Sequence, residues 1–68
     1  MTRNQIITAA EKFTAEEFVT LLEARNISFA VIDQDNICDP NDGYLNLAVE
    51  GLDVGEALLF VDGEFSGL

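Results

Sequence analysis

Two capping signatures near the start of the chain constrain its fold more than any other feature. Thr2 is followed three residues later by Gln5, and Thr14 is followed three residues later by Glu17. In a capping box the threonine hydroxyl accepts a hydrogen bond from the third backbone N–H, and the Gln or Glu side chain returns to the threonine N–H. Each signature therefore marks the first turn of a helix.

Apolar residues recur at helical spacing after each signature. They predict a short helix from Arg3 to about Lys12 and a second helix from Ala15 to Arg25, on which Glu16 and Glu23 share the outer, polar face. Neither Pro nor Gly separates the two segments, so a single bent helix is the alternative.

Two strands are expected after the helices. The run from Ser28 to Asp33 is apolar and rich in β-branched and aromatic residues, which favours a central strand buried on both faces. The run from Tyr44 to Glu50 alternates apolar and polar residues, which predicts a strand with one solvated face. The segment 39–43 between them is typical of a turn, in which Pro40 presets φ and Asn41 tolerates the left-handed conformation.

The last part of the chain predicts a hairpin. Ala57 to Val61 is a continuous apolar run that ends at Asp62-Gly63, and Asp-Gly between apolar runs is a strong hairpin signal. A short helix capped by Asp53 is the alternative. The whole pattern predicts one α+β domain over residues 1–68, with an N-terminal helix or helical hairpin packed on a small three- to four-stranded antiparallel sheet. The 49% content of hydrophobic residues argues against disorder despite the charge.

The charge is strongly one-sided, with thirteen acids, three bases and a formal net charge of −10. The bases are Arg3, Lys12 and Arg25, so no base follows Ala30. Mixed charge is the ordinary state of a solvated surface, and a field of one sign serves steering or mimicry. We therefore predict that the nine acids after Ala30 bind a partner. They are Asp33, Asp35, Asp39, Asp42, Glu50, Asp53, Glu56, Asp62 and Glu64.

Catalysis is disfavoured by the residues that the chain lacks. It has no histidine, and its single cysteine, Cys38, lies beside Asp39, whose charge disfavours the reactive thiolate. We therefore expect no enzyme, no disulfide, no zinc site and no cofactor, and we interpret Cys38 as a small, semi-buried residue.

A calcium loop matches the sequence only in part. Asp39, Asn41, Gly43 and Glu50 fall at ligand positions of an EF-hand register, but Tyr44 stands where the loop needs glycine. We expect no functional metal site.

The charge and the hydropathy also limit partners and compartment. Phosphates repel an anionic protein, so neither nucleic acid nor an anionic membrane is expected as a direct partner. No apolar run has the length of a membrane helix, and no secretion signal is evident. We expect a protein of the bacterial host cytoplasm that binds a basic nucleic-acid-binding protein.

In size, α+β pattern and the acidic tract from Asp33 to Glu64, the chain resembles the small acidic inhibitors made by bacteriophages, including the DNA-mimicking anti-CRISPR proteins. The resemblance covers character and no motif. It implies a mechanism in which the acids occupy the basic site where a CRISPR-Cas effector subunit reads its DNA target or the adjacent PAM.

Two other classes remain open. One is an immunity protein or antitoxin that plugs the basic active site of a nuclease toxin, and the other is an acidic interaction domain without mimicry, in which the acids are a solvated face. Because all three bases lie in the first 25 residues, the helical side is expected to face away from the partner. Glu16 and Glu23 should then be unimportant for binding.

Overall fold

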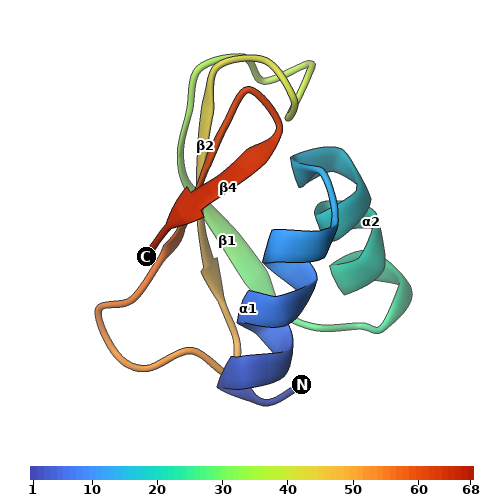
Figure 1. Ribbon diagram of the computed structural model, residues 1–68, viewed down its shortest axis with the longest axis vertical. Coiled ribbons are helices and arrows are strands. Elements are labelled where there is room, and N and C mark those ends of the chain that lie inside the picture. The colour runs from blue at the N-terminus through green and yellow to red at the C-terminus, as the bar shows by residue number, and fades with distance from the viewer.

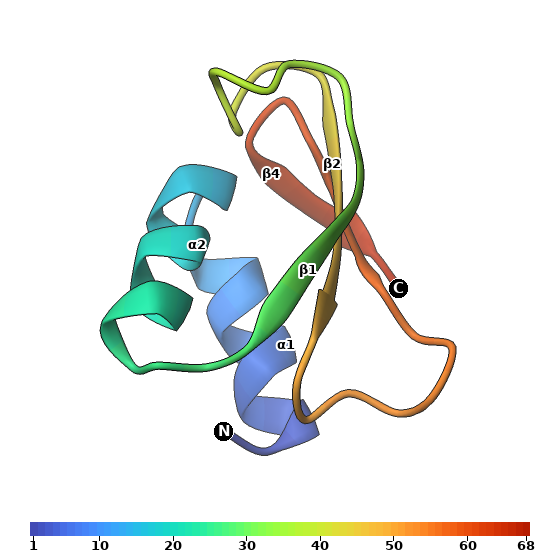
Figure 2. The same cartoon turned by 180° about the vertical axis from the view of Figure 1, so that it is seen from behind.

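The structure, a computed structural model, describes residues 1–68 and has the predicted α+β architecture. Two N-terminal helices are followed by four strands. The elements in order are α1 (Arg3–Lys12), α2 (Ala15–Ala24), β1 (Phe29–Gln34), β2 (Tyr44–Val49), β3 (Leu58–Val61) and β4 (Glu64–Gly67). Both helices pack against one face of the sheet and leave the other face uncovered (Figures 1 and 2).

The two helices are separate, and both predicted capping boxes form. The Thr2 hydroxyl accepts a hydrogen bond from the Gln5 N–H at 3.2 Å, and the Thr14 hydroxyl accepts one from the Glu17 N–H at 3.3 Å. Phe13 between them has extended backbone angles, φ −110° and ψ 157°, so the alternative of one bent helix is wrong. The second helix ends at Ala24, one residue before the predicted Arg25, which is its C-cap.

The sheet is an antiparallel meander with strand order β1-β2-β3-β4. The predicted alternation on β2 is confirmed, because Leu45, Leu47 and Val49 are buried while the residues between them are partly exposed. The strand prediction for 57–61 and the hairpin are also confirmed, since β3 and β4 are joined at Asp62 and Gly63, whose φ angles are 49° and 84°. Positive φ at both central residues is the conformation that two-residue hairpins favour.

The core lies between the helices and the inner face of the sheet. Phe60 of β3 is its centre, with its ring centroid 5.4 Å from that of Phe18 on α2 and 5.8 Å from that of Phe65 on β4. Phe18 and Phe60 are fully buried, as are Ile6 and Leu22 of the helices. Burial of one such side chain stabilises a fold by about 1.5–3 kcal/mol, so these few contacts hold both layers together.

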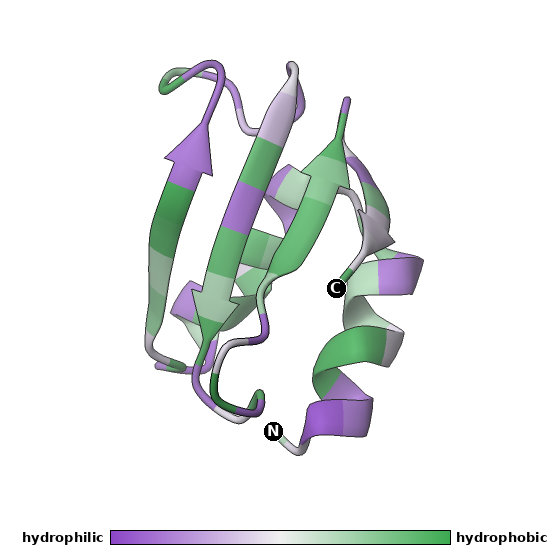
Figure 3. Ribbon diagram, turned by 90° about the vertical axis from the view of Figure 1, so that its left-hand side faces the viewer, coloured by the Kyte–Doolittle hydropathy of each residue, from purple (hydrophilic) through white to green (hydrophobic).

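One prediction for the sheet is wrong, because β1 is an edge strand and not a central one. Val31 is 48% exposed and Ile32 is 59% exposed. The apolar run indicated burial on both faces, but the meander places no strand beyond β1 (Figure 3). The pairing with β2 also shifts register between Val31 and Asp33, so Ile32 forms a bulge.

The predicted turn between β1 and β2 forms with a different conformation. The Asp42 N–H donates to the Asp39 carbonyl at 3.1 Å, which leaves Pro40 and Asn41 at the two central positions. The sequence had indicated a left-handed conformation at Asn41, but Asn41 does not adopt it. The positive φ, 72°, lies at Gly43. The Asn41 side chain is instead committed to a long-range contact, in which its Oδ1 accepts a hydrogen bond from the Glu16 N–H at 3.0 Å.

Candidate functional site

Three segments that lie far apart in the sequence meet at one end of the molecule. The Asp62 N–H donates to the Gly43 carbonyl at 2.8 Å, which joins the β3–β4 turn to the β1–β2 connection. The Ala15 N–H donates to the Gly63 carbonyl at 2.9 Å, which adds the start of α2. This end, which we call the acidic end, carries six carboxylates, those of Glu16, Asp33, Asp35, Asp39, Asp42 and Asp62.

Most carboxylates of the acidic end are fixed by one hydrogen bond and keep a second oxygen free. Asp39 Oδ1 accepts from the Asn41 N–H at 2.9 Å, and Asp62 Oδ1 accepts from the Gly43 N–H at 3.1 Å. Asp42 Oδ2 accepts from the Asn36 amide at 3.0 Å. Because these side chains are already ordered, a partner that binds the free oxygens loses less conformational entropy.

Tyr44 organises the two remaining aspartates. Its hydroxyl donates to Asp33 Oδ2 at 2.9 Å, and its backbone N–H donates to Asp35 Oδ2 at 3.3 Å. The hydrogen bond to Asp33 raises the pKa of Tyr44, and the negative charges of Asp33 and Asp35 raise it further. Asp33 Oδ1 also accepts from the Gln34 N–H at 2.9 Å. Both Asp33 oxygens are therefore occupied, so Asp33 is the least free acid of this end.

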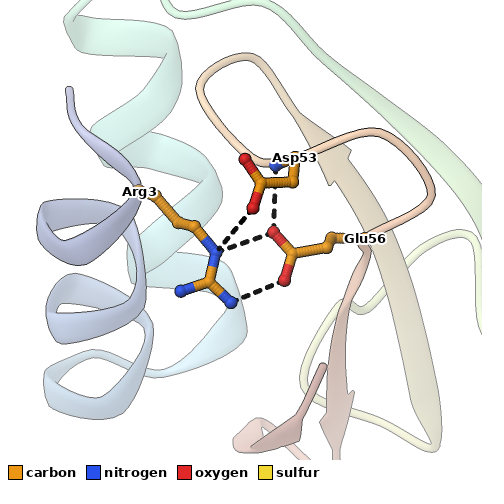
Figure 4. Close-up of polar contacts among 3 residues, drawn as sticks. All are labelled: Arg3, Asp53 and Glu56. Carbon is orange, nitrogen blue, oxygen red and sulfur yellow. Dashed lines mark hydrogen bonds and ion pairs between the residues drawn. The ribbon is translucent and has the colours of Figure 1, made fainter.

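The opposite end of the molecule contains acids that the protein neutralises itself. Arg3 donates to Glu56 from Nε at 2.7 Å and from Nη2 at 2.5 Å, and Arg3 Nε lies 3.6 Å from Asp53 Oδ2 (Figure 4). The Asp53 N–H also donates to Glu56 Oε1 at 2.9 Å. The hydrogen bond from Arg3, with that from the Asp53 N–H, lowers the pKa of Glu56 to about 2. The same hydrogen bond raises the pKa of Arg3.

The nine acids predicted to bind a partner are thus divided. Five of them belong to the acidic end, whereas Asp53 and Glu56 form ion pairs with Arg3 at the other end. Glu50 follows β2 at that other end, and Glu64 begins β4; the side chain of neither forms a hydrogen bond or ion pair. The acidic end is therefore the part of the predicted site that the fold assembles.

Glu16 belongs to the acidic end although it is not one of the nine acids predicted to bind a partner. Its carboxylate Oε2 lies 3.5 Å from the Asn41 amide nitrogen, and its N–H is bonded to the same residue. The structure therefore places Glu16 beside the acidic loop, although it starts a helix of the side that was expected to face away from the partner. Glu16 and Asn41 are 25 residues apart in the sequence, so no local pattern indicates their contact. The only signal available in the sequence is the position of Glu16 in the first turn of the predicted second helix.

The two remaining bases lie together on the helical side. Lys12 and Arg25 form no ion pair, and both line a groove of about 410 Å³ between α1 and α2 whose lining includes no acid. The Lys12 ammonium lies 5.6 Å from the centroid of the Phe13 ring. The molecule is therefore electrically polar, with uncompensated acids at one end of the sheet and uncompensated bases between the helices.

Other kinds of site find little support in the geometry. Cys38 is exposed rather than semi-buried as the sequence had indicated, because it lies in the open β1–β2 connection. No three His, Cys, Asp or Glu side chains come close enough together to hold a metal ion. None of the helices is long and apolar enough to cross a membrane.

Comparison with known proteins found no matching family, no similar curated protein and no similar solved structure. Function has therefore to be inferred from the geometry and charge of this chain.

Proposed function

We propose that this protein is a binding protein whose acidic end occupies the basic nucleic-acid-binding site of a partner protein and so blocks access to that site. The observation that carries this proposal is the meeting of six carboxylates from three separate segments at one end, with no lysine or arginine bonded to any of them. An ordinary acidic surface would scatter these charges or pair them with bases.

The chemistry of the acidic end suits a groove that evolved to hold phosphates. Lysine and arginine side chains bind carboxylates through charge-assisted hydrogen bonds, and arginine binds them through two parallel bonds. At Asp39, Asp42 and Asp62 one oxygen is held by the protein and the other is free, so the free oxygens have fixed positions. A net charge of −10 also accelerates the encounter with a basic surface and repels nucleic acid itself.

The partner that the resemblance in size and charge indicates first is a CRISPR-Cas effector subunit, at the site where it reads the DNA target or the PAM. A nuclease toxin, bound at its basic active site, is the second candidate. Both belong to the bacterial cytoplasm and both involve the same contacts, so one set of variants tests the acidic end against either partner.

The test must separate charge from loop structure, because the same carboxylates also hold the loop. Asp→Asn substitution keeps an acceptor oxygen and removes the charge. The double variant Asp39→Asn, Asp42→Asn is compared with the matched double variant Glu11→Gln, Glu50→Gln, whose residues lie outside the acidic end and form no side-chain hydrogen bond. Each is titrated against a purified CRISPR effector and against a nuclease toxin, with and without their nucleic acids.

We expect the Asp39, Asp42 variant to bind the partner at least about tenfold more weakly, since loss of a close charge pair at an interface commonly has that effect or more. The control variant should bind like the wild type and should compete equally with DNA. Equal weakening by the two variants would show that bulk charge alone counts. Mobility-shift assays with DNA and RNA should show no binding, and tight binding to either would disprove the proposal.

A further inference from the structure

The open edge of β1 is a second surface that the acidic end does not explain. Alternate residues of a strand direct their backbone N–H and C=O groups to opposite sides. The Ser28 carbonyl accepts from the Glu50 N–H at 2.9 Å, and the Asp35 N–H donates to the Tyr44 carbonyl at 3.0 Å, so both point toward β2. The direction alternates along the strand from Ser28 to Val31, and again from Asp35 back to Asp33 on the other side of the register shift. The backbone N–H and C=O groups of Phe29, Val31 and Gln34 therefore point away from β2.

Part of this edge is already closed, but Phe29 and Val31 are not. The Gln34 N–H donates to Asp33 Oδ1 at 2.9 Å, and the bulge at Ile32 interrupts the strand just before it. No strand lies beyond β1 to bond the outward groups of Phe29 and Val31. The edge is therefore open over three residues, with two N–H groups and two C=O groups free to pair.

The side chains around this open edge are apolar at the centre and acidic at both ends. Val31 and Ile32 are exposed. An open hollow of about 420 Å³ beside the start of β1 is lined by residues that include Glu23 and Phe29, and Asp33 lies at the other end of the strand. Proteins commonly protect an exposed edge with lysine, but no lysine or arginine occurs anywhere in this sheet. Charge complementarity therefore favours an occupant with basic residues.

We propose that the edge of β1 at Phe29–Val31 adds an extended basic segment of the partner protein as a fifth strand. Backbone hydrogen bonds to Phe29 and Val31 supply the pairing, as in other cases of strand addition. Apolar side chains of the segment pack beside Val31, and its lysine or arginine side chains reach Glu23 and Asp33. This inference rests on the proposed function, because it takes the partner to be basic, and it adds the form in which part of that partner binds.

A second copy of this chain is the competing occupant, and the charge disfavours it. Two molecules that each carry −10 repel one another. Pairing of two β1 strands would also bring their Asp33 side chains close to the same short interface, with no base in either sheet to compensate them.

The test uses a short peptide of alternating lysine and valine, and a control peptide of alternating lysine and glycine that has the same charge and a low strand propensity. Amide hydrogen exchange is measured residue by residue by NMR on the intact protein. Addition of the lysine-valine peptide should slow exchange of the outward Phe29 and Val31 N–H groups and leave the inward Ala30 N–H, already bonded to β2, unchanged. The lysine-glycine peptide should change chemical shifts at the acidic end without protecting these two amides.

Two substitutions at one position complete the test. Val31→Pro removes the outward N–H and leaves the bonds to β2 intact, a place in an edge strand that proline tolerates. Val31→Thr keeps that N–H and the β-branched shape. Circular dichroism and thermal melts confirm that both variants fold. We expect Val31→Pro to bind the lysine-valine peptide about fivefold to tenfold more weakly, while Val31→Thr stays close to the wild type.

The possible results separate the two proposals. Shift changes confined to the acidic end, with no protection of Phe29 and Val31, would overturn the strand addition and leave the proposed function standing. The opposite result is protection of both amides while the Asp39→Asn, Asp42→Asn variant binds its protein partner as tightly as the wild type. That result would overturn the proposed function and leave the strand addition standing. Protection that depends on protein concentration alone, without peptide, would assign the edge to a second copy and overturn the inference.

Discussion

The two ends of this molecule treat the same chemical group in opposite ways. At one end Arg3 binds Glu56 through two hydrogen bonds and lies near Asp53, so the protein compensates its own acids. At the acidic end the carboxylates accept hydrogen bonds only from neutral backbone and side-chain donors. These bonds fix the positions of the acids and leave their charge in place.

A count of acids therefore does not define the charge of a surface. Asp53 and Glu56 belong to the same base-free stretch as Asp39 and Asp42, and nothing in the sequence separates the two pairs. Arg3, from the first turn of α1, compensates the charges of Asp53 and Glu56 and does not reach the acids of the acidic end.

The largest effect is expected at Gly43, where the acidic end depends on glycine. Gly43 has a φ of 72°, and a Cβ there would overlap the Asp35 side chain. Gly43→Ala should therefore destabilise the protein by about 3 kcal/mol, because left-handed strain adds to the loss of the Asp35 contact with Tyr44. Gly55, between β2 and β3, has a similar φ of 84° with open space around it. Gly55→Ala should cost only about 1 kcal/mol.

Urea unfolding of the two glycine variants measures this difference. Equal losses at the two positions would mean that backbone strain acts alone and that the Asp35 side chain contributes nothing to the rigidity of the acidic end.

The melting temperature should change in opposite directions when the two ends are altered. Arg3→Gln should lower the melting temperature by a few degrees, because it removes two hydrogen bonds and leaves Asp53 and Glu56 repelling one another. Asp39→Asn with Asp42→Asn should leave it unchanged or raise it, because it relieves repulsion and keeps the acceptor oxygens. A lower melting temperature in both variants would show that the acidic end is compensated by a group that the contacts do not reveal.

Added salt should raise the melting temperature of the wild type by screening the acids.

Local sequence signals predicted most of the fold. Both capping boxes, the alternation of Leu45 to Val49 and the Asp62-Gly63 turn depend on residues a few positions apart, so the sequence states them directly. The position of β1 did not follow, because an apolar run indicates burial and not which neighbour provides it. The bulge at Ile32 has no local signature at all.

The sequence predicted the negative charge of the candidate site but not which of the acids come together in space. The acids are visible in the sequence, but their division depends on contacts between distant residues, such as Arg3 with Glu56 and Glu16 with Asn41. Such contacts arise from tertiary packing, which composition does not encode.

The stability of the compensated end depends on pH through Glu56. Because the pKa of Glu56 falls to about 2 in the folded protein from an ordinary value of 4.5, its contribution to stability is complete above pH 4.5 and is lost as the pH falls toward 2. Glu56→Gln should therefore be less stable than the wild type at pH 7, and the gap should narrow as the pH falls and close only below pH 2. Thermal melts across this range test the prediction, and a constant gap between the two proteins would contradict it.

The smallest effect concerns Tyr44, which reports on the acidic end. The hydrogen bond to Asp33 and the charges nearby raise its pKa above the ordinary 10.0, so the phenol of the folded protein ionises later than that of the unfolded chain. The stabilisation is therefore complete below pH 10 and is lost as the pH rises through the pKa of the folded protein.

The chain has one tyrosine and no tryptophan, so ultraviolet difference absorbance follows the Tyr44 titration without interference. Asp33→Asn keeps an acceptor for the hydroxyl and removes the charge, so the titration midpoint should fall toward 10.0. Asp53→Asn, at the compensated end, should leave it unchanged. An unchanged midpoint in Asp33→Asn would mean that the Asp33 charge does not act on Tyr44, and the acids of this end would then be more strongly screened by solvent than their contacts imply.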